Sequence, residues 1–240
     1  MIKKIHFETI DSTNLWCKNN LESFDNNNIY CITADEQISG KGTNNRKWIS
    51  PKGGFYCTLC FKISESNNIN TLPLVMGMSM CNILNKKNIN ANIKWPNDII
   101  LNNKKIGGIL SEAIKQNNEL WVIIGLGLNV NLNKEQINGI DRILFPASSI
   151  LIENKINLKP YSILDDFLKD FQNNLCNWSK YNFSYFKEIY NKYNILNKKT
   201  IYINSNNNEY VGEYVDINND GILELRTNSQ IKKFTYGDMI

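Results

Sequence analysis

The chain has 240 residues, of which 42% are hydrophobic and 11% aromatic, enough for one large domain, or for one with a small appendage. A charged fraction of 21% excludes wholesale disorder, and a net charge of +4 without a concentrated basic stripe argues against a dedicated nucleic-acid binder. No run reaches the roughly 18 apolar residues of a membrane span, and residues 1–8 do not form a signal peptide. We therefore expect a cytoplasmic protein without a membrane partner.

Cysteine and histidine usage gives little support for metal or triad chemistry. Of the six cysteines only Cys57 and Cys60 have a CxxC spacing, and they lie in a strand-like run where positions i and i+3 face opposite sides. We expect buried, unpaired thiols there. Because His6 is the single histidine, a zinc site that uses histidine and a serine–histidine–aspartate triad are both disfavoured.

The first 86 residues alternate between strands and helices. Capping side chains at 11–13 precede Leu15 and Trp16 at helical spacing, so a helix is expected to begin there. Hydrophobic periodicity predicts strands at 2–8, 29–34 and 54–63, a polar, glycine-containing loop at 36–52 and an amphipathic helix at 71–86.

Three strand-like runs then follow in quick succession, at 91–101, 105–114 and 120–130. The short polar segments between them predict two hairpin connections in an antiparallel sheet. Helices are expected at 160–180 and 183–193.

The pattern changes near residue 197, where short alternating strands begin. They are expected at 200–204, 209–217, 222–227 and 231–236, with a turn at 219–221. The predicted fold class is α+β, an antiparallel or mixed sheet with packed helices, followed by a small β-barrel that is too small to be very stable alone. We expect one domain at 1–196 and a second at 197–240.

The loop from Gly40 to Trp48 is the first segment with chemical potential. Its glycines let the backbone approach a ligand, its basic side chains attract phosphate or carboxylate, and Trp48 can cover an apolar group. Taken alone, an ordinary surface loop with scattered charge is the better interpretation.

The second segment is Lys94-Trp95-Pro96-Asn97-Asp98. A proline in a strand-like run marks an edge or a bulge. Lys94 is suited to phosphate oxygens, and Asp98 to Mg²⁺ or a ribose hydroxyl. A strand end with an Asn-Asp turn explains the same residues equally well.

The third segment combines Lys105, Gly107 and Gly108 with the run from Gly125 to Asn129. Glycines inside strands are costly and often mark close backbone approach. Gly125-Leu126-Gly127 lacks the third glycine and the following helix of a dinucleotide fingerprint. Lys105 is expected across a hairpin from residues 94–98, which would gather two lysines in one patch.

Together these segments resemble the catalytic domain of biotin–protein ligases over essentially the whole chain, in the family's order. Five motifs carry the resemblance: DSTN at 11–14, the biotin loop at 36–48, KWPND at 94–98, K-I-G-G-I-L at 105–110 and G-L-G-L-N at 125–129. The resemblance implies the fold of class II synthetase-like biotin and lipoate ligases, with a small C-terminal domain similar to Src-homology-3 domains.

The resemblance also implies a two-step reaction. Biotin and MgATP would form biotinyl-5′-adenylate and pyrophosphate, after which a lysine of a carrier protein would displace AMP. Because the biotin carboxylate and the α-phosphate are both anionic, local positive charge and Mg²⁺ must offset their repulsion. ATP and Mg²⁺ would be co-substrates and biotin the substrate, with no permanently bound cofactor.

Residue roles follow from the resemblance alone. Lys105, Lys94 and Asp98 would be catalytic, with Asp98 as a candidate Mg²⁺ ligand. Biotin would be bound by Ser12, Thr13, Asn14, Gln37, Gly40, Lys41, Gly42, Thr43, Trp48, Lys105, Gly107 and Gly108. ATP would be bound by Lys41, Arg46, Lys94, Asn97, Asp98, Lys105 and Asn129.

The loop departs from the family pattern at three positions. Lys41 stands where arginine is usual, Thr43 where a second arginine is common, and Asn45 replaces a glycine, whereas Arg46 remains. Lysine keeps the charge but loses bidentate geometry. We hypothesise that this loop holds the adenylate less tightly than an arginine-rich one.

The implied partner is the biotin carboxyl carrier domain of a biotin-dependent carboxylase such as acetyl-CoA carboxylase. Residue 1 lies close to the DSTN segment, so we expect no N-terminal helix-turn-helix and no sequence-specific DNA binding. A monomer and a weak homodimer both stay open. A lipoate or octanoate ligase of the same fold is the nearest alternative. A non-catalytic biotin-binding module is disfavoured by Lys105, Lys94 and Asp98, and a nucleic-acid binder by the absence of a basic face.

Overall fold

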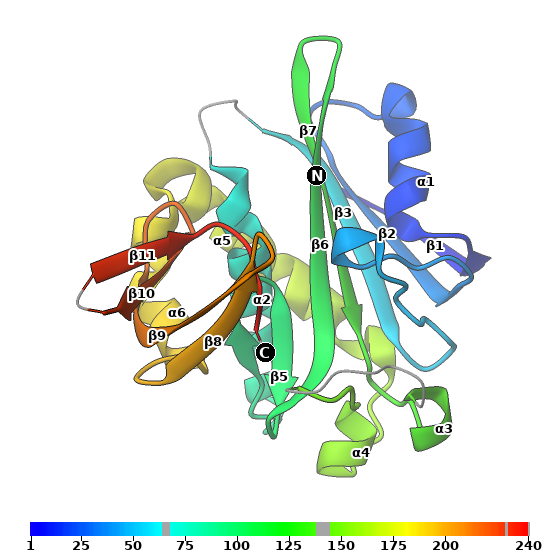
Figure 1. Ribbon diagram of the computed structural model, residues 1–240. Helices are drawn as coiled ribbons and strands as arrows, with labels where there is room; N and C mark the ends of the chain where they lie inside the picture. Colours follow the sequence, from blue (N-terminus) through cyan, green and yellow to red (C-terminus); the bar gives the residue numbers. More distant parts are fainter. Residues whose placement is uncertain (64–67, 138–144, 229, 240) are drawn as a thin grey trace.

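The computed structural model describes residues 1–63, 68–137, 145–228 and 230–239. A seven-stranded sheet forms its centre, in the order β1-β2-β3-β7-β6-β5-β4 (Figure 1). Strand β1 runs parallel to β2 and the other neighbours are antiparallel, so the sheet is mixed. The strands are β1 (Ile2–Ile10), β2 (Ile29–Gln37), β3 (Phe55–Ile63), β4 (Asn92–Lys94), β5 (Asp98–Leu101), β6 (Lys104–Gln116) and β7 (Glu119–Leu128).

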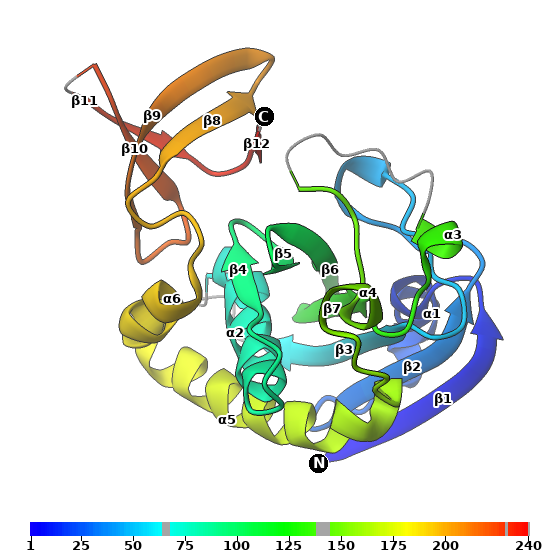
Figure 2. The same cartoon turned by 90° about the horizontal axis from the view of Figure 1, so that it is seen from below.

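Helices cover both faces of this sheet (Figure 2). Helix α1 packs on β2, β3 and β7, where Cys17, Ile32 and Trp121 belong to one small apolar cluster. Helices α2 and α5 pack against each other on the opposite face and build the main core. The helices are α1 (Thr13–Asn20), α2 (Leu72–Asn85), α3 (Lys134–Ile137), α4 (Ile150–Asn154), α5 (Leu164–Tyr181) and α6 (Lys187–Tyr193). The α+β prediction is confirmed.

Asparagine pairs make the tight turns of the hairpins. Asn102-Asn103 joins β5 to β6, and Asn117-Asn118 joins β6 to β7. All four residues have positive φ, which a two-residue type I′ turn requires and which asparagine tolerates better than most residues. The strong use of asparagine therefore has a structural role at these turns, in addition to filling polar loops.

The expectation of one strand over 91–101 is wrong. The run divides into β4 and β5, which pair with each other around Trp95-Pro96-Asn97, so this part of the sheet contains three hairpins instead of two. The reason is Pro96: it has no N–H to donate to a ladder, and it lies in the turn between the two strands. The register consequently places Lys94 directly opposite Asp98.

The C-terminal strands form a second, five-stranded antiparallel sheet in the order β11-β10-β9-β8-β12, which fits a small Src-homology-3-like barrel. They are β8 (Thr200–Ser205), β9 (Asn208–Ile217), β10 (Leu223–Thr227), β11 (Gln230–Phe234) and β12 (Asp238–Met239). The predicted turn at 219–221 is present, with Gly221 at a φ of +77°. The domain boundary at 196–197 stays a prediction.

This second sheet shares its core with the larger part of the molecule. Ile203, Leu223 and Leu225 are fully buried and belong to the same apolar cluster as α2 and α5. The buried Trp95 donates its indole N–H to the carbonyl of Gly221, at 2.8 Å. A sheet too small for a core of its own is thus stabilised by the core that it joins.

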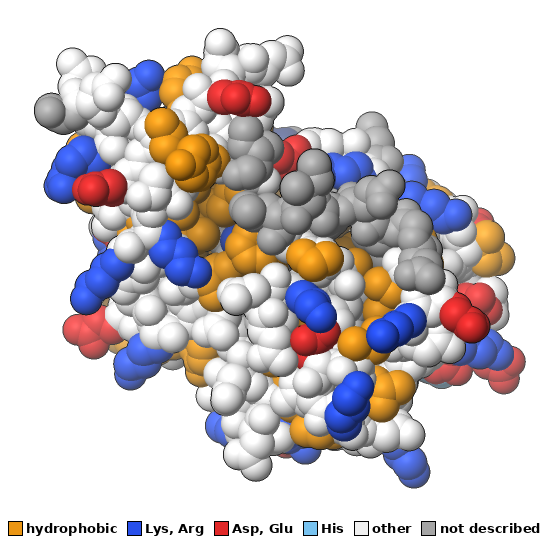
Figure 3. Space-filling view, turned by 60° about the horizontal axis from the view of Figure 1, so that its bottom comes forward, with side chains coloured by type: hydrophobic (Ala, Val, Ile, Leu, Met, Phe, Trp, Pro, Cys, Tyr) orange, Lys and Arg blue, Asp and Glu red, His pale blue; other side chains and the backbone are white. Residues whose placement is uncertain are grey.

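The two thiols with a CxxC spacing are placed as the sequence predicts. Cys57 and Cys60 are buried, unpaired, and lie in apolar clusters on opposite faces of β3. Lysine and arginine side chains are scattered over the face seen in Figure 3 and form no single basic patch there. No helix among the described residues has the length and apolarity needed to cross a membrane.

Candidate functional site

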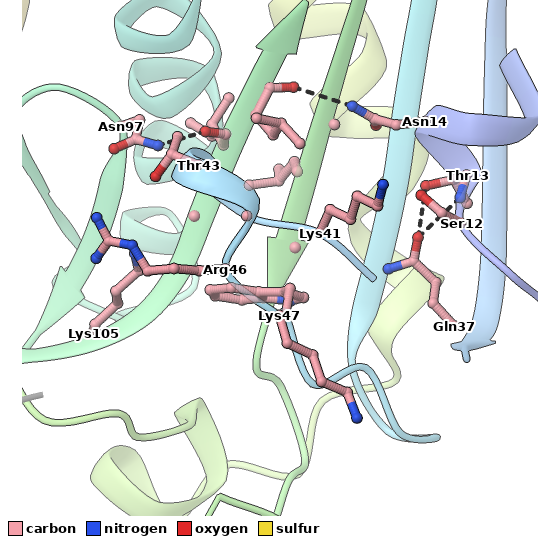
Figure 4. Close-up of a pocket in the computed structure, with 18 residues that line it drawn as sticks. Ser12, Thr13, Asn14, Gln37, Lys41, Thr43, Arg46, Lys47, Asn97 and Lys105 are labelled. Atoms are coloured by element: carbon pink, nitrogen blue, oxygen red, sulfur yellow. Dashed lines mark hydrogen bonds between the residues drawn. The ribbon is translucent and has the colours of Figure 1, made fainter. Parts of the chain in front are cut away.

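One cleft brings together most of the residues singled out in the sequence (Figure 4). It lies against β6 and β7 between the start of α1 and the loop 40–48. The predicted residues that line it are Ser12, Thr13, Asn14, Gln37, Lys41, Gly42, Thr43, Arg46, Trp48, Asn97, Lys105 and Gly108. Residues that the sequence did not assign to the site also line it: Lys47, Ile109, Leu110, Gly125, Leu126 and Gly127.

Five predicted residues do not line this cleft: Gly40, Gly107, Lys94, Asp98 and Asn129. A Cβ atom on Gly40 would lie 2.5 Å from the carbonyl oxygen of Trp48, and one on Gly107 would lie 3.0 Å from that of Gly127, so both glycines allow close packing. The amide of Asn129, which is buried, donates to the carbonyl of Ser148 at 2.9 Å, while its carboxamide oxygen has no hydrogen-bond partner among the described residues.

The start of α1 forms the polar end of the cleft. The Ser12 hydroxyl caps the helix by accepting from the N–H of Leu15. Thr13 donates both its backbone N–H and its hydroxyl to the carboxamide oxygen of Gln37, at 2.9 and 3.0 Å (Figure 4). The capping turn thus fixes the Thr13 and Gln37 side chains against each other.

Asn14 is held by a partly buried network that sequence reasoning missed. Its amide lies 3.2 Å from a carboxylate oxygen of Glu112, which also pairs with Lys18. Its carboxamide oxygen accepts from the Thr58 hydroxyl at 2.7 Å. Thr58 and Glu112 lie on strands whose alternation predicts only burial, so no local signal assigned them to the site.

Glycines on β6 and β7 make room for the side chains that line the cleft. A Cβ atom on Gly125 would lie 2.2 Å from the Asn14 carboxamide oxygen, and one on Gly127 would lie 2.4 Å from the Trp48 indole nitrogen. Real Cβ contacts are essentially never this short. The expectation that these strand glycines mark close approach is confirmed, and what approaches are side chains of the site.

The strongest electrostatic feature is the Asp98 carboxylate between two ammonium groups. It pairs with Lys94 at 2.8 Å through one oxygen and with Lys105 through the other. All three side chains are at least 89% buried. Burial alone would raise the pKa of the Asp98 carboxyl, but the charges and hydrogen bonds of Lys105 and Lys94 outweigh it and lower that pKa to about 2.

Lys105 connects this buried cluster to the cleft. Its ammonium group lies 5.5 Å from the centre of the Trp48 ring, within cation–π range, and the side chain lines the cleft. Lys94 lies on the other side of Asp98, 5.4 Å from the ring of Phe145, a residue that the sequence did not single out. The two lysines therefore face different surroundings although they share one carboxylate.

Arg46 lines the cleft, but its guanidinium forms an ion pair with a residue of the C-terminal sheet. One of its terminal nitrogens lies 2.6 and 2.7 Å from the two carboxylate oxygens of Asp238 on β12. Both side chains are well exposed, so this ion pair contributes little to stability. It nevertheless brings the loop 40–48 into contact with the C-terminal sheet.

Within the described part of the chain, no group of three or more His, Cys, Asp or Glu side chains is placed to hold a metal. The candidate metal ligand Asp98 has both carboxylate oxygens on lysines. The assignment of Mg²⁺ to Asp98 stays a prediction.

Residues 6–129 match the Biotin/lipoate A/B protein ligase family, and residues 199–240 match the biotin protein ligase C terminal domain. The chain belongs to the biotin/lipoate A/B protein ligase family. The first matched range contains every residue that lines the cleft, and the second covers the C-terminal sheet.

Several relatives carry ligase names. The chain is 27% identical over 214 residues to the bifunctional ligase/repressor BirA of Bacillus subtilis, covering 87% of this chain and 65% of that one. It is 29% identical over 108 residues to the biotin–[acetyl-CoA-carboxylase] ligase of Paracoccus denitrificans, covering 41% of this chain and 43% of that one. The chain thus spans just under two thirds of the length of the Bacillus relative.

Among solved structures, the biotin protein ligase from Aquifex aeolicus in complex with biotin and ATP has a TM-score of 0.80 to this chain. The two are 26% identical, and the match covers 99% of this chain and 97% of that chain. The similarity therefore includes both sheets of the molecule.

We expect Gly127→Ala to lower the free energy of unfolding by about 1–3 kcal/mol, because the new methyl group overlaps the Trp48 ring. Urea unfolding measures this change. Gly77→Ala is the matched control: it lies in α2, its Cβ would be 3.5 Å from the nearest atoms, and alanine favours a helix. Equal stability of the two variants would show that the Gly127–Trp48 contact is not tight.

We expect Asp98→Asn to be destabilising at pH 7, since it removes a buried carboxylate that pairs with two buried ammonium groups. The Asp98 pKa is lower in the folded than in the unfolded chain. Its stabilisation is therefore complete above about pH 4 and is lost as the pH falls towards 2, which amounts to about 2 kcal/mol.

The stability gap between the wild type and Asp98→Asn should therefore narrow as the pH falls from 5 to 3, measured by urea unfolding at each pH. Asp165→Asn is the control, because Asp165 pairs with Lys4 at the exposed surface. A gap that is constant over this range would contradict the lowered pKa of Asp98.

Proposed function

We propose that this protein is an ATP-dependent biotin–protein ligase. It forms biotinyl-5′-adenylate from biotin and MgATP and then transfers biotin to a lysine of a carrier protein. The observation that carries the proposal is that a single cleft is lined by the polar end at Ser12–Asn14, the basic loop 40–48 and Lys105. The similarity to a solved ligase in complex with biotin and ATP supports it.

In the first step a carboxylate oxygen of biotin attacks the α-phosphorus of ATP, and pyrophosphate leaves. Attack requires two anions to approach each other, so positive charge at the junction lowers the barrier. Lys105 supplies a charge that the buried Asp98 holds in place. Lys41 and Lys47 add charges from the loop. The step needs positioning and electrostatics and no proton transfer from the enzyme.

In the second step the neutral amine of the carrier lysine attacks the acyl carbon of the mixed anhydride. The bond to the phosphate oxygen breaks, AMP leaves, and the amine loses its proton to form the amide. We propose a biotin carboxyl carrier domain of a carboxylase as the acceptor. The name of the Paracoccus denitrificans relative supports this choice.

We assign Mg²⁺ to the nucleotide, as a co-substrate. Each carboxylate oxygen of Asp98 is paired with one of the two lysines. Its first role is therefore to orient the two lysines. Lys94, Asn97 and Asn129 are assigned to ATP by resemblance, and the buried carboxamide oxygen of Asn129, without a partner among the described residues, fits a ligand with an N–H donor.

Biotin is preferred over lipoate or octanoate because the far end of the cleft is polar. The hydroxyls and carboxamides of Ser12, Thr13 and Gln37 suit a ligand head that both donates and accepts hydrogen bonds. An alkyl chain would remove water from these polar groups without offering them a hydrogen bond, which disfavours it. The match of the C-terminal region to the biotin protein ligase C terminal domain favours the same choice.

The test is exchange of labelled pyrophosphate into ATP with biotin, lipoate and octanoate in parallel. We expect exchange with biotin, and Lys105→Ala should lower it at least about a hundredfold, as loss of one preorganised charge typically does. Lys62→Ala removes a lysine that pairs with Glu119 outside the cleft and should leave exchange unchanged.

Circular dichroism establishes that each lysine variant is folded. Exchange with lipoate but not with biotin would show that the substrate is lipoate and that the proposal of biotin is wrong. Near-normal exchange by folded Lys105→Ala would show that the central charge lies elsewhere.

A second prediction concerns the loop, where Thr43 stands at a position that is commonly arginine in the family. An arginine can bind phosphate oxygens bidentately. We therefore expect Thr43→Arg to release biotinyl-adenylate more slowly than the wild type, measured by trapping the released adenylate over time. Thr43→Gln adds length without charge and should not slow release. Equal rates for all three proteins would contradict the hypothesis of a loosely held adenylate.

A further inference from the structure

The loop 40–48 is closed at its base by contacts between residues before and after it. The backbone N–H of Gln37 donates to the carbonyl of Ser50, and that of Trp48 donates to the carbonyl of Gly40, both at 2.9 Å. Lys41 and Lys47 form a second bridge further along. Residues 37 and 50 therefore define where the loop leaves the sheet and where it returns.

The Ser50 hydroxyl is the side-chain contact across this base. It is 3% exposed, accepts from the Gln37 amide at 2.9 Å and donates to the Trp48 carbonyl at 3.1 Å. A hydroxyl has one proton, and a carbonyl can only accept. Because that proton goes to Trp48, the group of Gln37 that faces Ser50 must be the donor.

The position of the Gln37 carboxamide oxygen follows from the same donor–acceptor argument. The backbone N–H of Thr13 can only donate, so the carboxamide oxygen of Gln37 must face Thr13. Both contacts therefore require the same orientation of the Gln37 amide, with its oxygen towards Thr13 and its nitrogen towards Ser50. Its nitrogen carries a second proton, and Gln37 lines the cleft, so the cleft is offered a donor at this position.

Gly40 gives separate evidence for the contact between the Ser50 hydroxyl and the Trp48 carbonyl. A Cβ atom there would lie 2.6 Å from the Ser50 hydroxyl and 2.5 Å from the Trp48 carbonyl oxygen. A glycine is needed for the hydroxyl and the carbonyl to meet in this space.

We propose that Ser50 is a positioning residue. Its hydroxyl fixes the Gln37 amide so that an N–H points to an acceptor oxygen on the polar head of the substrate. The same hydroxyl connects this end of the cleft to the loop 40–48. Ser50 does not line the cleft itself, so it acts through Gln37. The inference rests on the proposed function and adds to it a residue outside the motifs that carry the resemblance.

The test measures biotin binding by titration calorimetry. Ser50→Ala should weaken binding about tenfold, since the amide loses one of its two anchors, which corresponds to one net hydrogen bond. In pyrophosphate exchange the KM for biotin should rise by a similar factor, with kcat changed much less. Ser79→Ala is the matched control: it is also buried and accepts from an amide, that of Asn174, at the same 2.9 Å, but outside the cleft. It should bind biotin like the wild type.

A double-mutant cycle separates positioning from a general loss of structure. If Ser50 acts through Gln37, adding Ser50→Ala to Gln37→Ala should weaken biotin binding little further. Ser50→Thr, which keeps the hydroxyl, should restore binding relative to Ser50→Ala. Additive effects of the two alanine substitutions would overturn the inference, as would wild-type binding by folded Ser50→Ala.

Ser50→Cys covers the case in which Ser50→Ala does not fold. It fills the space of the hydroxyl with a somewhat larger thiol, which is only a weak donor and acceptor, so binding should again be weakened. Wild-type biotin affinity in folded Ser50→Cys would overturn the inference while leaving the proposed function intact. Absence of biotin binding by the wild-type protein would instead overturn the proposed function itself.

Discussion

The structure of the site depends on one interaction, the Asp98 carboxylate shared by Lys94 and Lys105. Two lysines cannot be buried side by side without an anion, since each would carry a large desolvation cost and would repel the other. The anion is in place because the sheet register sets Lys94 opposite Asp98, and Asp98 opposite Gly108. The turn at Pro96, which divides one expected strand into two, is therefore the condition for the charge cluster.

The cleft exists because β6 and β7 lack side chains where other elements come close. The Asn14 side chain of α1 occupies the position that a side chain on Gly125 would need, and the Trp48 side chain of the loop does the same at Gly127. A substitution at either position would displace a lining side chain while leaving the ladder of the sheet unaffected. Glycine in a strand costs stability by itself, and here the gain is a surface on which a helix turn and a loop are held against the same two strands.

The sequence predicted the main strands and the first helix cap, because these are set by local periodicity and capping, and its motifs predicted most of the cleft-lining residues. It failed where the outcome depends on partners far along the chain. Nothing near Ser50 or Thr58 indicates a role, since each acts through hydrogen bonds to residues that only the fold brings close. Nor does the local sequence show that Arg46 meets Asp238, a contact across 192 positions.

That last contact changes how the charge of the loop is understood. The loop is less basic than is usual in the family, with Thr43 in place of an arginine, and its remaining Arg46 is paired with the C-terminal sheet. The charge that is firmly positioned in the cleft is then Lys105, whose partner Asp98 is buried and whose strand belongs to the central sheet. Loop charges are exposed and screened, whereas a buried pair is not. Preorganisation therefore rests with the sheet, and the loop contributes cover and a donor-presenting Gln37 at its base.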